Sequence, residues 1–515
     1  MPMDRHRGLE IVQNKKSADL FMRAQAHIDA GRHLEALQCY LKVIKIIPNS
    51  WDAGFRCGVL LFELQRYEEA LSFLDRAQKQ QPGHATTFYM RARTLRMLRR
   101  FKEAIVPSEQ AEALAPDDPD VFNNSGIILH CLCRDADALD RFDRAIRLRP
   151  HFVDAIINQA NSLVQLRRFT EAFSRYAAAK SLAPYDTTID WNIAQLKMLT
   201  GDFAAGWVGR ESRWTKKAAP VPYPRFPTPM WLGQEAVAGK TILVYADEGL
   251  GDAIQFARYL PLLAAHGARV VLVADEALHC LLSRLPGVAL CVPKSEGAAV
   301  PRFDLHCALS SLPLAFGTRL DSIPSARAYF PAVPAEELRA WEARLGDRKG
   351  MRIGLAWSGQ QRHVNDHNRS IPLNLMAQLV TGDAQFVSLQ KDPRPGDMAI
   401  LRERSDIADH TRHMTDFSAT AALVSCLDLV ITVDTSVAHL AAAYGRPTWI
   451  LLPYTPDYRW LLDRDDSPWY PTVRLFRQDD TRNYETVIER VAAALAKQTS
   501  SFGVASFDQP MAGRA

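Results

Sequence analysis

Two polar turns, far apart in the sequence, carry the residue types that could do chemistry. The first, residues 249–252, reads GLGD, and the second, residues 434–436, reads DTS, with His439 shortly after it. A positioned carboxylate such as Asp252 can act as a general base. Hydroxyls and backbone N–H groups at the start of a helix bind diphosphates. If the two turns face one another, they suit a general base set against a leaving diphosphate.

The second turn is predicted to lie between a buried strand and a helix. Residues 427–433 form a continuous apolar run, as in a strand buried on both faces. Apolar residues recur at helical spacing over residues 437–443, and residues 448–452 predict the next strand. Such turns lie at the carboxyl edge of open parallel sheets, where ligands bind, although Thr435 and Ser436 could instead only cap a structural helix. The candidate donor-binding residues here are Asp434, Thr435, Ser436 and His439.

The first turn follows a predicted strand over residues 241–246, and the next helix is expected to begin at about Ala253. Gly249 and Gly251 allow a tight turn and close approach of a ligand to the backbone. Neither GxGxxG nor GxxxxGK[ST] occurs here, so a dinucleotide-binding fingerprint and a P-loop are both unsupported. Asp252 has two interpretations: a simple helix N-cap, or a carboxylate that points into a cleft opposite the second turn.

Short apolar runs alternate with amphipathic stretches from residue 237 onward, which predicts parallel sheets covered by helices. Two Rossmann-like domains with a cleft between them, residues 237–345 and 346–498, are the expected architecture. A proline-rich linker, residues 217–236, precedes them, and residues 499–515 are expected to form a disordered tail. The predicted strands are 241–246, 270–274, 288–292, 353–357, 385–389, 429–433, 448–452 and 473–476, and the predicted helices include 255–266, 278–285 and 335–344.

Residues 1–216 contain an internal repeat, in which one proline and one alanine each recur every 34 residues. A period of 34 with a small residue and a terminal proline resembles the tetratricopeptide repeat. The alanine lets paired helices approach closely, and the proline stops the second helix of each pair. We expect an α-helical superhelix whose concave face binds a protein or peptide, ended by a degenerate copy at residues 201–207. The prolines are Pro48, Pro82, Pro116, Pro150 and Pro184, and the alanines are Ala36, Ala70, Ala104, Ala138 and Ala172.

Asparagines occupy one column of the later repeats. Asn124, Asn158 and Asn192 are also 34 residues apart, near the middle of successive first helices. An asparagine amide can both donate to and accept from an extended peptide backbone. These three are therefore candidate acceptor-groove residues, and the alternative is that they satisfy neighbouring segments within the solenoid.

Composition excludes several classes of protein. The 515 residues are 47% hydrophobic and 23% charged, a globular mixture, and the net charge of +4 is too small to indicate a nucleic-acid partner. The eight cysteines show no CxxC or Cys/His ligand spacing, so we expect reduced cysteines in the core of a cytosolic chain. The sequence starts without an apolar leader and has no window of about 18 apolar residues. We therefore expect a cytoplasmic protein without a membrane span.

The two turns together carry a resemblance. Residues 251–252 after the first strand, with DTSVAH at residues 434–439, are similar to glycosyltransferase family 9, which contains the ADP-heptose-dependent heptosyltransferases and has the two-domain GT-B fold. A closer likeness is to bacterial proteins that join tetratricopeptide repeats to such a domain. The resemblance implies a repeat superhelix followed by an α/β GT-B fold. Its further motifs are Trp357, Gly359, Asp366, Arg369, Ser370, DYRWLLDR at residues 457–464 and SPWYP at residues 467–471.

The resemblance also implies roles for matching residues. Asp252 stands at the position of the family's catalytic base. Asp434, Thr435 and His439 stand in the segment that binds the donor's diphosphate and sugar, where Ser436 replaces the usual glycine.

Two basic residues are candidates for holding the donor phosphates. Arg369, in the loop after the strand at residues 353–357, is a looser match, and Lys391 is an alternative cation; either could instead be a surface charge. GT-B enzymes need no metal, so the DRD at residues 463–465 is interpreted as a loop feature and no metal site is expected.

The resemblance implies an inverting, metal-independent transfer of a sugar from a nucleotide-sugar to an acceptor hydroxyl, with no cofactor. Repeats joined to such a domain are similar in plan to the O-linked N-acetylglucosamine transferases, in which an asparagine ladder holds peptides. This plan implies a protein acceptor modified at Ser or Thr, such as a surface or flagellar protein. Two alternatives stay open: a lipid- or polysaccharide-linked glycan acceptor, and a non-catalytic repeat scaffold with a decayed transferase domain.

Overall fold

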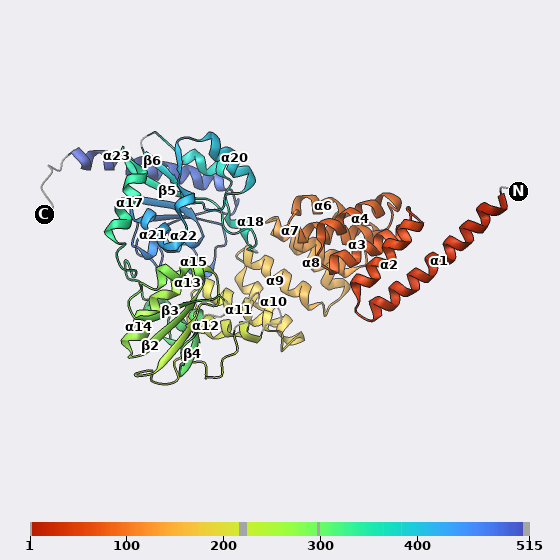
Figure 1. Cartoon of the computed structure of the whole chain (residues 1–515), viewed down its shortest axis with the longest axis horizontal. Coiled ribbons are helices and arrows are strands. Elements are labelled where there is room, and N and C mark those ends of the chain that lie inside the picture. The colour runs from red at the N-terminus through yellow and green to blue at the C-terminus, as the bar shows by residue number, and fades with distance from the viewer. Residues whose placement is uncertain (1–2, 216–223, 296–298, 364, 383, 508–515) are drawn as a thin grey trace. The chain divides into compact units, whose positions relative to one another are not determined.

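The chain divides into two compact units that meet between Tyr185 and Asp186. The computed structural model describes residues 3–215, 224–295, 299–363, 365–382 and 384–507 (Figure 1). The last residue of the predicted repeat domain, residue 216, the first part of the predicted linker, residues 217–223, and the end of the predicted tail, residues 508–515, lie outside the described residues. Among the described residues, no helix combines the length and the apolar character needed to cross a membrane.

The first unit consists of helices that pack against one another in sequence order, which confirms the predicted helical superhelix (Figure 1). Each of its second helices ends two residues before the repeating proline, as the sequence predicts. The helices are α1 (Met3–Asp29), α2 (His33–Ile46), α3 (Trp51–Glu63), α4 (Tyr67–Gln80), α5 (Ala85–Met97), α6 (Phe101–Leu114), α7 (Pro119–Cys131), α8 (Asp135–Leu148), α9 (Val153–Gln165) and α10 (Phe169–Leu182).

Two repeating features close each helical pair. Every alanine of the repeating column is fully buried, so the helices approach closely at these positions. The turn between the helices of a pair contains a left-handed residue with φ between 57° and 60° at four positions of the same column. Gly31 and Gly201 occupy the same column at the two ends of the array, where glycine adopts this conformation without steric cost. The four left-handed residues are Gln65, Arg99, Cys133 and Arg167.

The buried alanine column gives a prediction about stability. Ala104 on α6 is fully buried against Leu71, Leu95 and Ile128. Ala104→Leu should therefore destabilise the repeats by about 1–3 kcal/mol, since extra methylenes strain a packed core. Urea denaturation of the full chain checks this, with Val106→Leu on the exposed face of the same helix as the control. Equal unfolding midpoints for the two variants would show that the column is not a packing constraint.

The second unit begins with one more helical pair, α11 (Thr187–Leu199) and α12 (Phe203–Arg210), followed by the 3₁₀ turn η1 (Glu211–Thr215). The sequence predicts a repeat domain that extends to residue 216, whereas this pair belongs to the second compact unit. Trp207 explains the difference, because its indole is buried and donates a 3.0 Å hydrogen bond to the Thr318 carbonyl.

The first sheet is parallel and has the strand order β3-β2-β1-β4. Three of its strands are predicted from the sequence, and β4 is not. The helix after β1 begins at Leu250, earlier than the predicted start near Ala253. The elements are β1 (Thr241–Tyr245), α13 (Leu250–Phe256), η2 (Ala257–Tyr259), α14 (Leu260–Ala265), β2 (Arg269–Ala274), α15 (Glu276–Leu282), β3 (Val288–Pro293), β4 (Leu305–Ala308), η3 (Leu309–Ser311), α16 (Leu312–Ala315) and η4 (Leu320–Ser322).

The second sheet is parallel with the order β10-β9-β8-β5-β6-β7, and together the two sheets match the expected pair of α/β domains (Figure 1). Strand β7 is not predicted, and α23 continues through residues 499–507, where the sequence predicts a disordered tail. The elements are α17 (Ala335–Leu345), β5 (Met351–Ala356), α18 (Asp366–Arg369), α19 (Leu373–Met376), η5 (Ala377–Leu379), β6 (Ala384–Ser388), α20 (Pro395–Glu403), β7 (Ile407–Asp409), η6 (Thr411–His413), α21 (Phe417–Ser425), β8 (Leu429–Val433), α22 (Ser436–Ala443), β9 (Thr448–Leu452), η7 (Tyr458–Trp460), β10 (Val473–Arg477) and α23 (Tyr484–Phe507).

Each sheet reverses its strand order at one point, and the two candidate turns lie there. In the first sheet the reversal falls between β1 and β4, and Asp252 follows β1. In the second it falls between β5 and β8, which Arg369 and Asp434 respectively follow. Ligands of open parallel sheets bind at such switch points, outside the carboxyl ends of the strands.

Candidate active site

The two candidate turns are in direct contact. Helix α13 has Gly249 as its N-cap and α22 has Thr435 as its N-cap, and the two helices pack against each other. A β-carbon built on Gly251 would lie 3.0 Å from His439 Cδ2 and 3.4 Å from Ser436 Cα. Glycine at 251 therefore permits an approach that a larger residue would hinder. The expected cleft is closed at this point, because the first turns of the two helices touch.

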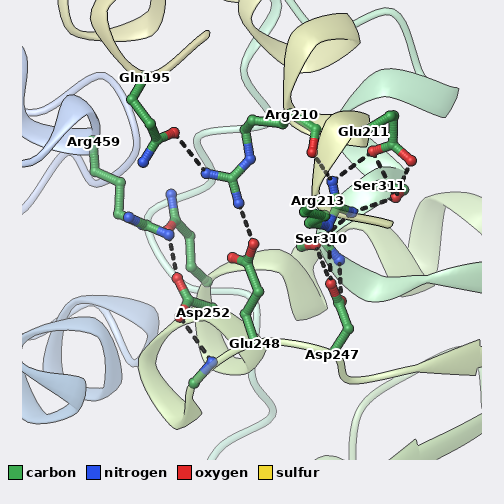
Figure 2. Close-up of polar contacts among 12 residues, drawn as sticks. Gln195, Arg210, Glu211, Arg213, Asp247, Glu248, Asp252, Ser310, Ser311 and Arg459 are labelled. Carbon is green, nitrogen blue, oxygen red and sulfur yellow. Dashed lines mark hydrogen bonds and ion pairs between the residues drawn. The ribbon is translucent and has the colours of Figure 1, made fainter. Parts of the chain in front are cut away.

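Asp252 is the third residue of α13 and not its N-cap. One carboxylate oxygen accepts a 3.0 Å hydrogen bond from the Gly249 N–H, and the other accepts one from the Arg459 guanidinium (Figure 2). The carboxylate therefore does stabilise the helix start, as the capping interpretation holds, yet it also reaches across to the second half. Burial raises the pKa of Asp252 to about 6; Glu248 adds to this rise, and Arg459 and Arg210 oppose it.

Arg459 is the residue of the second half that meets Asp252. Its guanidinium also donates to Gln255 Oε1 at 2.6 Å and to Asp457 Oδ1 at 2.7 Å, and it is almost completely buried on η7. In the sequence Arg459 belongs only to the DYRWLLDR motif, which does not indicate its partner. Arg459 and Asp252 lie 207 positions apart in the sequence.

Arg369 contacts the second candidate turn. Its guanidinium donates a 3.0 Å hydrogen bond to the Asp434 carbonyl. A β-carbon built on Gly359 would lie 2.7 Å from Arg369 Nη2, so the glycine gives the guanidinium its space. The Thr435 hydroxyl lies 3.2 Å from that of Thr432 and does not cap α22. The structure therefore brings Arg369 to the start of α22. Its role in holding a diphosphate stays a prediction.

Burial shifts the pKa values of two groups at this turn in the direction that favours their uncharged forms. Burial raises the pKa of the Asp434 carboxyl, as does the nearby Asp457, whereas Arg369 lowers it. His439 is buried, and its Nδ1 lies 2.8 Å from the Tyr470 hydroxyl, while its ring stacks on Trp460 at 5.4 Å. Burial lowers the pKa of His439 well below its ordinary value, so the imidazole is neutral at neutral pH.

Lys391 and the asparagine column have other neighbours. The Lys391 ammonium donates to the Met414 carbonyl. Asn124 is buried and accepts a 3.2 Å hydrogen bond from Arg96, and the Asn158 amide donates to Asn123 Oδ1 at 3.0 Å. Hydrogen bonds of this kind are expected if the asparagines only satisfy neighbouring segments within the solenoid. An acceptor-binding role for them stays a prediction. Asn192 lies on α11, in the second compact unit.

A small recess lies beside Asp252, and it has no space for even a water molecule. Binding of a larger ligand at this point therefore requires the lining residues to move. The recess is lined by Ala246, Asp247, Glu248, Asp252, Ala253, Phe256, Leu309 and Ser310. No group of three or more His, Cys, Asp or Glu in the described part of the chain is arranged to hold a metal ion.

Comparison with known proteins agrees with both parts of this architecture. Residues 413–491 match the model of glycosyltransferase family 9 (heptosyltransferase). Residues 21–85, 58–119 and 136–187 match the tetratricopeptide repeat model. The chain therefore contains segments similar to tetratricopeptide repeats and a segment similar to glycosyltransferase family 9, as predicted. The segment similar to family 9 contains the Thr435 turn and Arg459, whereas Asp252 lies outside it.

Individual proteins are similar to this chain only at low sequence identity. Protein FlbA of Caulobacter vibrioides is 27% identical over 324 residues, which cover 59% of this chain and 54% of FlbA. Similar solved structures include MamA from Desulfovibrio magneticus RS-1, with 19% identity and a TM-score of 0.32, covering 32% of this chain and 94% of that one. The peptide-binding TPR protein YrrB has 20% identity and a TM-score of 0.32, covering 35% of this chain and 93% of YrrB. Scores this low carry no inference about function.

Proposed function

We propose that this protein is an inverting, metal-independent glycosyltransferase that moves a sugar from a nucleotide-sugar to an acceptor hydroxyl. The observation that supports it most is the contact between the start of α13, which carries Asp252, and the start of α22. Both are the switch points of their sheets, and residues 413–491 match a glycosyltransferase family. A base and an anion-binding helix start thus meet at one place.

The mechanism follows from these positions. The donor diphosphate binds at the N-terminus of α22, where backbone N–H groups and the helix dipole favour an anion, with Arg369 beside it. The Asp252 carboxylate takes the proton of the acceptor hydroxyl as its oxygen attacks the anomeric carbon. The bond from that carbon to the diphosphate breaks, and the nucleoside diphosphate leaves with its charge stabilised by Arg369 and the helix start.

The acceptor that we propose is a protein held by the tetratricopeptide repeats. Stacked repeats form extended concave surfaces for protein binding, and three segments of this chain match the repeat model. Incubating the full chain with candidate proteins and a donor should add the mass of one sugar to the acceptor. Transfer to a lipid-linked glycan and to none of the proteins would replace the protein acceptor by a glycan.

The donor class is tested by a thermal-shift screen. A ligand that binds the native state raises the melting temperature by mass action. We expect one of the UDP-, ADP-, GDP- or CMP-sugars to raise Tm and the matching nucleoside diphosphate to compete with it. If no nucleotide-sugar shifts Tm or is consumed, the chain is a repeat scaffold without transferase activity.

The activity should depend on pH through Asp252. A general base works only when it is deprotonated, and the pKa of this carboxyl is raised to about 6. We therefore expect kcat/KM to fall about tenfold per unit below pH 6 and to level off roughly one unit above it. Initial rates across a buffer series check this, and a profile that is still flat at about pH 5 would exclude Asp252 as the base.

A further inference from the structure

A row of charged side chains, with two carboxylates between two arginines, lies between the last helical pair and η7 and includes the proposed base (Figure 2). Arg210, the last residue of α12, donates to Glu248 Oε1 at 2.5 Å. Glu248 lies in the same turn as Asp252, whose carboxylate accepts from Arg459 on the opposite half. The turn that carries the base is therefore held between a cation from each side.

Arg210 is fixed in place by its surroundings. Its side chain is 2% exposed, and its guanidinium also donates to Gln195 on α11 at 3.2 Å. The aromatic rings of Trp191, Trp207 and Tyr458 lie around it, with centroids 5.0–5.7 Å from the guanidinium carbon. A buried guanidinium with this packing has little freedom, so it holds Glu248 at a defined position.

A second arginine of the same segment, Arg213, forms hydrogen bonds with residues of the first sheet's switch point. Arg213 donates to the hydroxyls of Ser310 and Ser311, at 2.9 and 2.6 Å, just after β4. Asp247, at the end of β1, accepts from the Ser310 hydroxyl at 2.6 Å and lies 3.4 Å from Arg213. The segment α12–η1 thus contacts the residues that follow both strands of the first switch point.

We propose that Arg210 is a positioning residue for Asp252, and that α11 and α12 are a working part of the catalytic unit and not only the end of a protein-binding array. The inference rests on the proposed function. Arg210 does not touch the acceptor or the donor; it acts through Glu248 on the turn between β1 and α13.

The charges around Asp252 predict the direction in which its pKa should change in each variant. The groups that act on Asp252 are Arg459, Glu248, Arg210 and Asp457. The two arginines lower the pKa of Asp252, and Glu248 and Asp457 raise it. Removing Arg210 should therefore move the acid limb of the rate profile to higher pH, whereas neutralising Glu248 should move it to lower pH.

The test compares four full-length variants: Arg210→Met, Arg210→Lys, Glu248→Gln and, as a matched control, Arg352→Met. Arg352 has the same 2% side-chain exposure and also pairs with a carboxylate, Glu342, but it lies at the start of β5, away from the carboxyl ends of the strands. Arg210→Met should lower kcat/KM by roughly 10- to 100-fold, as expected when a reacting group is misplaced. Arg210→Lys should recover part of this loss.

Two readouts separate positioning from a merely structural role. The acid limb should move in opposite directions in Arg210→Met and Glu248→Gln and stay in place in Arg352→Met. The titration of the isotope-labelled Asp252 carboxyl carbon, assigned by its loss in Asp252→Asn, should move likewise without any need for turnover. An unmoved titration in Arg210→Met, or the same shift in Arg352→Met, would overturn the inference. If the wild-type protein consumes no nucleotide-sugar, the proposed function fails, and the carbon titration still decides whether Arg210 acts on Asp252.

Discussion

Replacing Asp252 with asparagine should lower kcat by roughly 10²- to 10⁴-fold, because the acceptor hydroxyl loses its proton acceptor. The substitution should preserve the helix start, since an amide oxygen can still accept from the Gly249 N–H. Donor affinity should therefore change little, and the loss should fall on turnover. Initial rates at saturating donor measure the effect, and donor titration confirms that binding is retained.

Asp275→Asn is the matched control for this variant. Asp275 also follows a strand of the first sheet, as the N-cap of α15 after β2, and its carboxylate pairs with Lys294 at 2.8 Å. It lies one strand away from the switch point, so its loss should leave turnover unchanged. Near-normal turnover in Asp252→Asn would remove the proposed base, and an equal loss in both variants would point to a general effect of carboxylates in this half.

Replacing Arg369 with methionine should raise the KM and Kd for the donor by roughly 10- to 100-fold, because a charged hydrogen bond to a phosphate contributes about 1.5–3 kcal/mol. The guanidinium already lies at the start of α22, bonded to the Asp434 carbonyl. Calorimetric titration with the nucleotide-sugar that the thermal screen identifies measures the change.

Lys391→Met separates the two cations that the sequence leaves as alternatives. The Lys391 ammonium donates to the Met414 carbonyl, so its removal should leave donor affinity close to wild type. A large loss of donor affinity in Lys391→Met, with normal affinity in Arg369→Met, would assign phosphate binding to Lys391 and not to Arg369.

Patterns that depend on local chemistry were predictable from the sequence. The 34-residue period follows from columns of proline and buried alanine, and the helices of the structure obey it. The strands of the two sheets follow from continuous apolar runs, since strands buried on both faces need apolar residues throughout. Short strands escape this signal: β7 covers three residues, and β4 includes His306, which breaks the apolar run.

The sequence identifies the two candidate turns by their residue types, but it does not identify the arginines that pair with them. Gly249, Gly251 and Asp252 stand out as a glycine turn with a carboxylate, and DTS stands out before a helical pattern. Nothing in the sequence distinguishes Arg459 and Arg210 from the other arginines. Only the tertiary fold brings them to Asp252 and Glu248, respectively. Long-range ion pairs leave no periodic trace in one sequence, so these two residues required a structure.

The boundary between repeats and transferase shows the same limit. The period continues through residues 201–207, so the sequence assigns this helical pair to the repeats. The contacts of Trp207 and Arg210 with the first α/β half place the pair in the second compact unit instead. A repeat unit can keep the register of an array while its buried side chains serve another domain.

A crystal structure of the full chain with the identified nucleoside diphosphate would show whether the diphosphate binds at α22. We expect phosphate oxygens within about 3 Å of backbone N–H groups in the first turn of α22 and of Arg369. We also expect α13 to move away from α22, with the Asp252 carboxylate facing the space where the sugar would lie. A diphosphate bound elsewhere, or one bound there with Asp252 turned away from it, would contradict sugar transfer at this site.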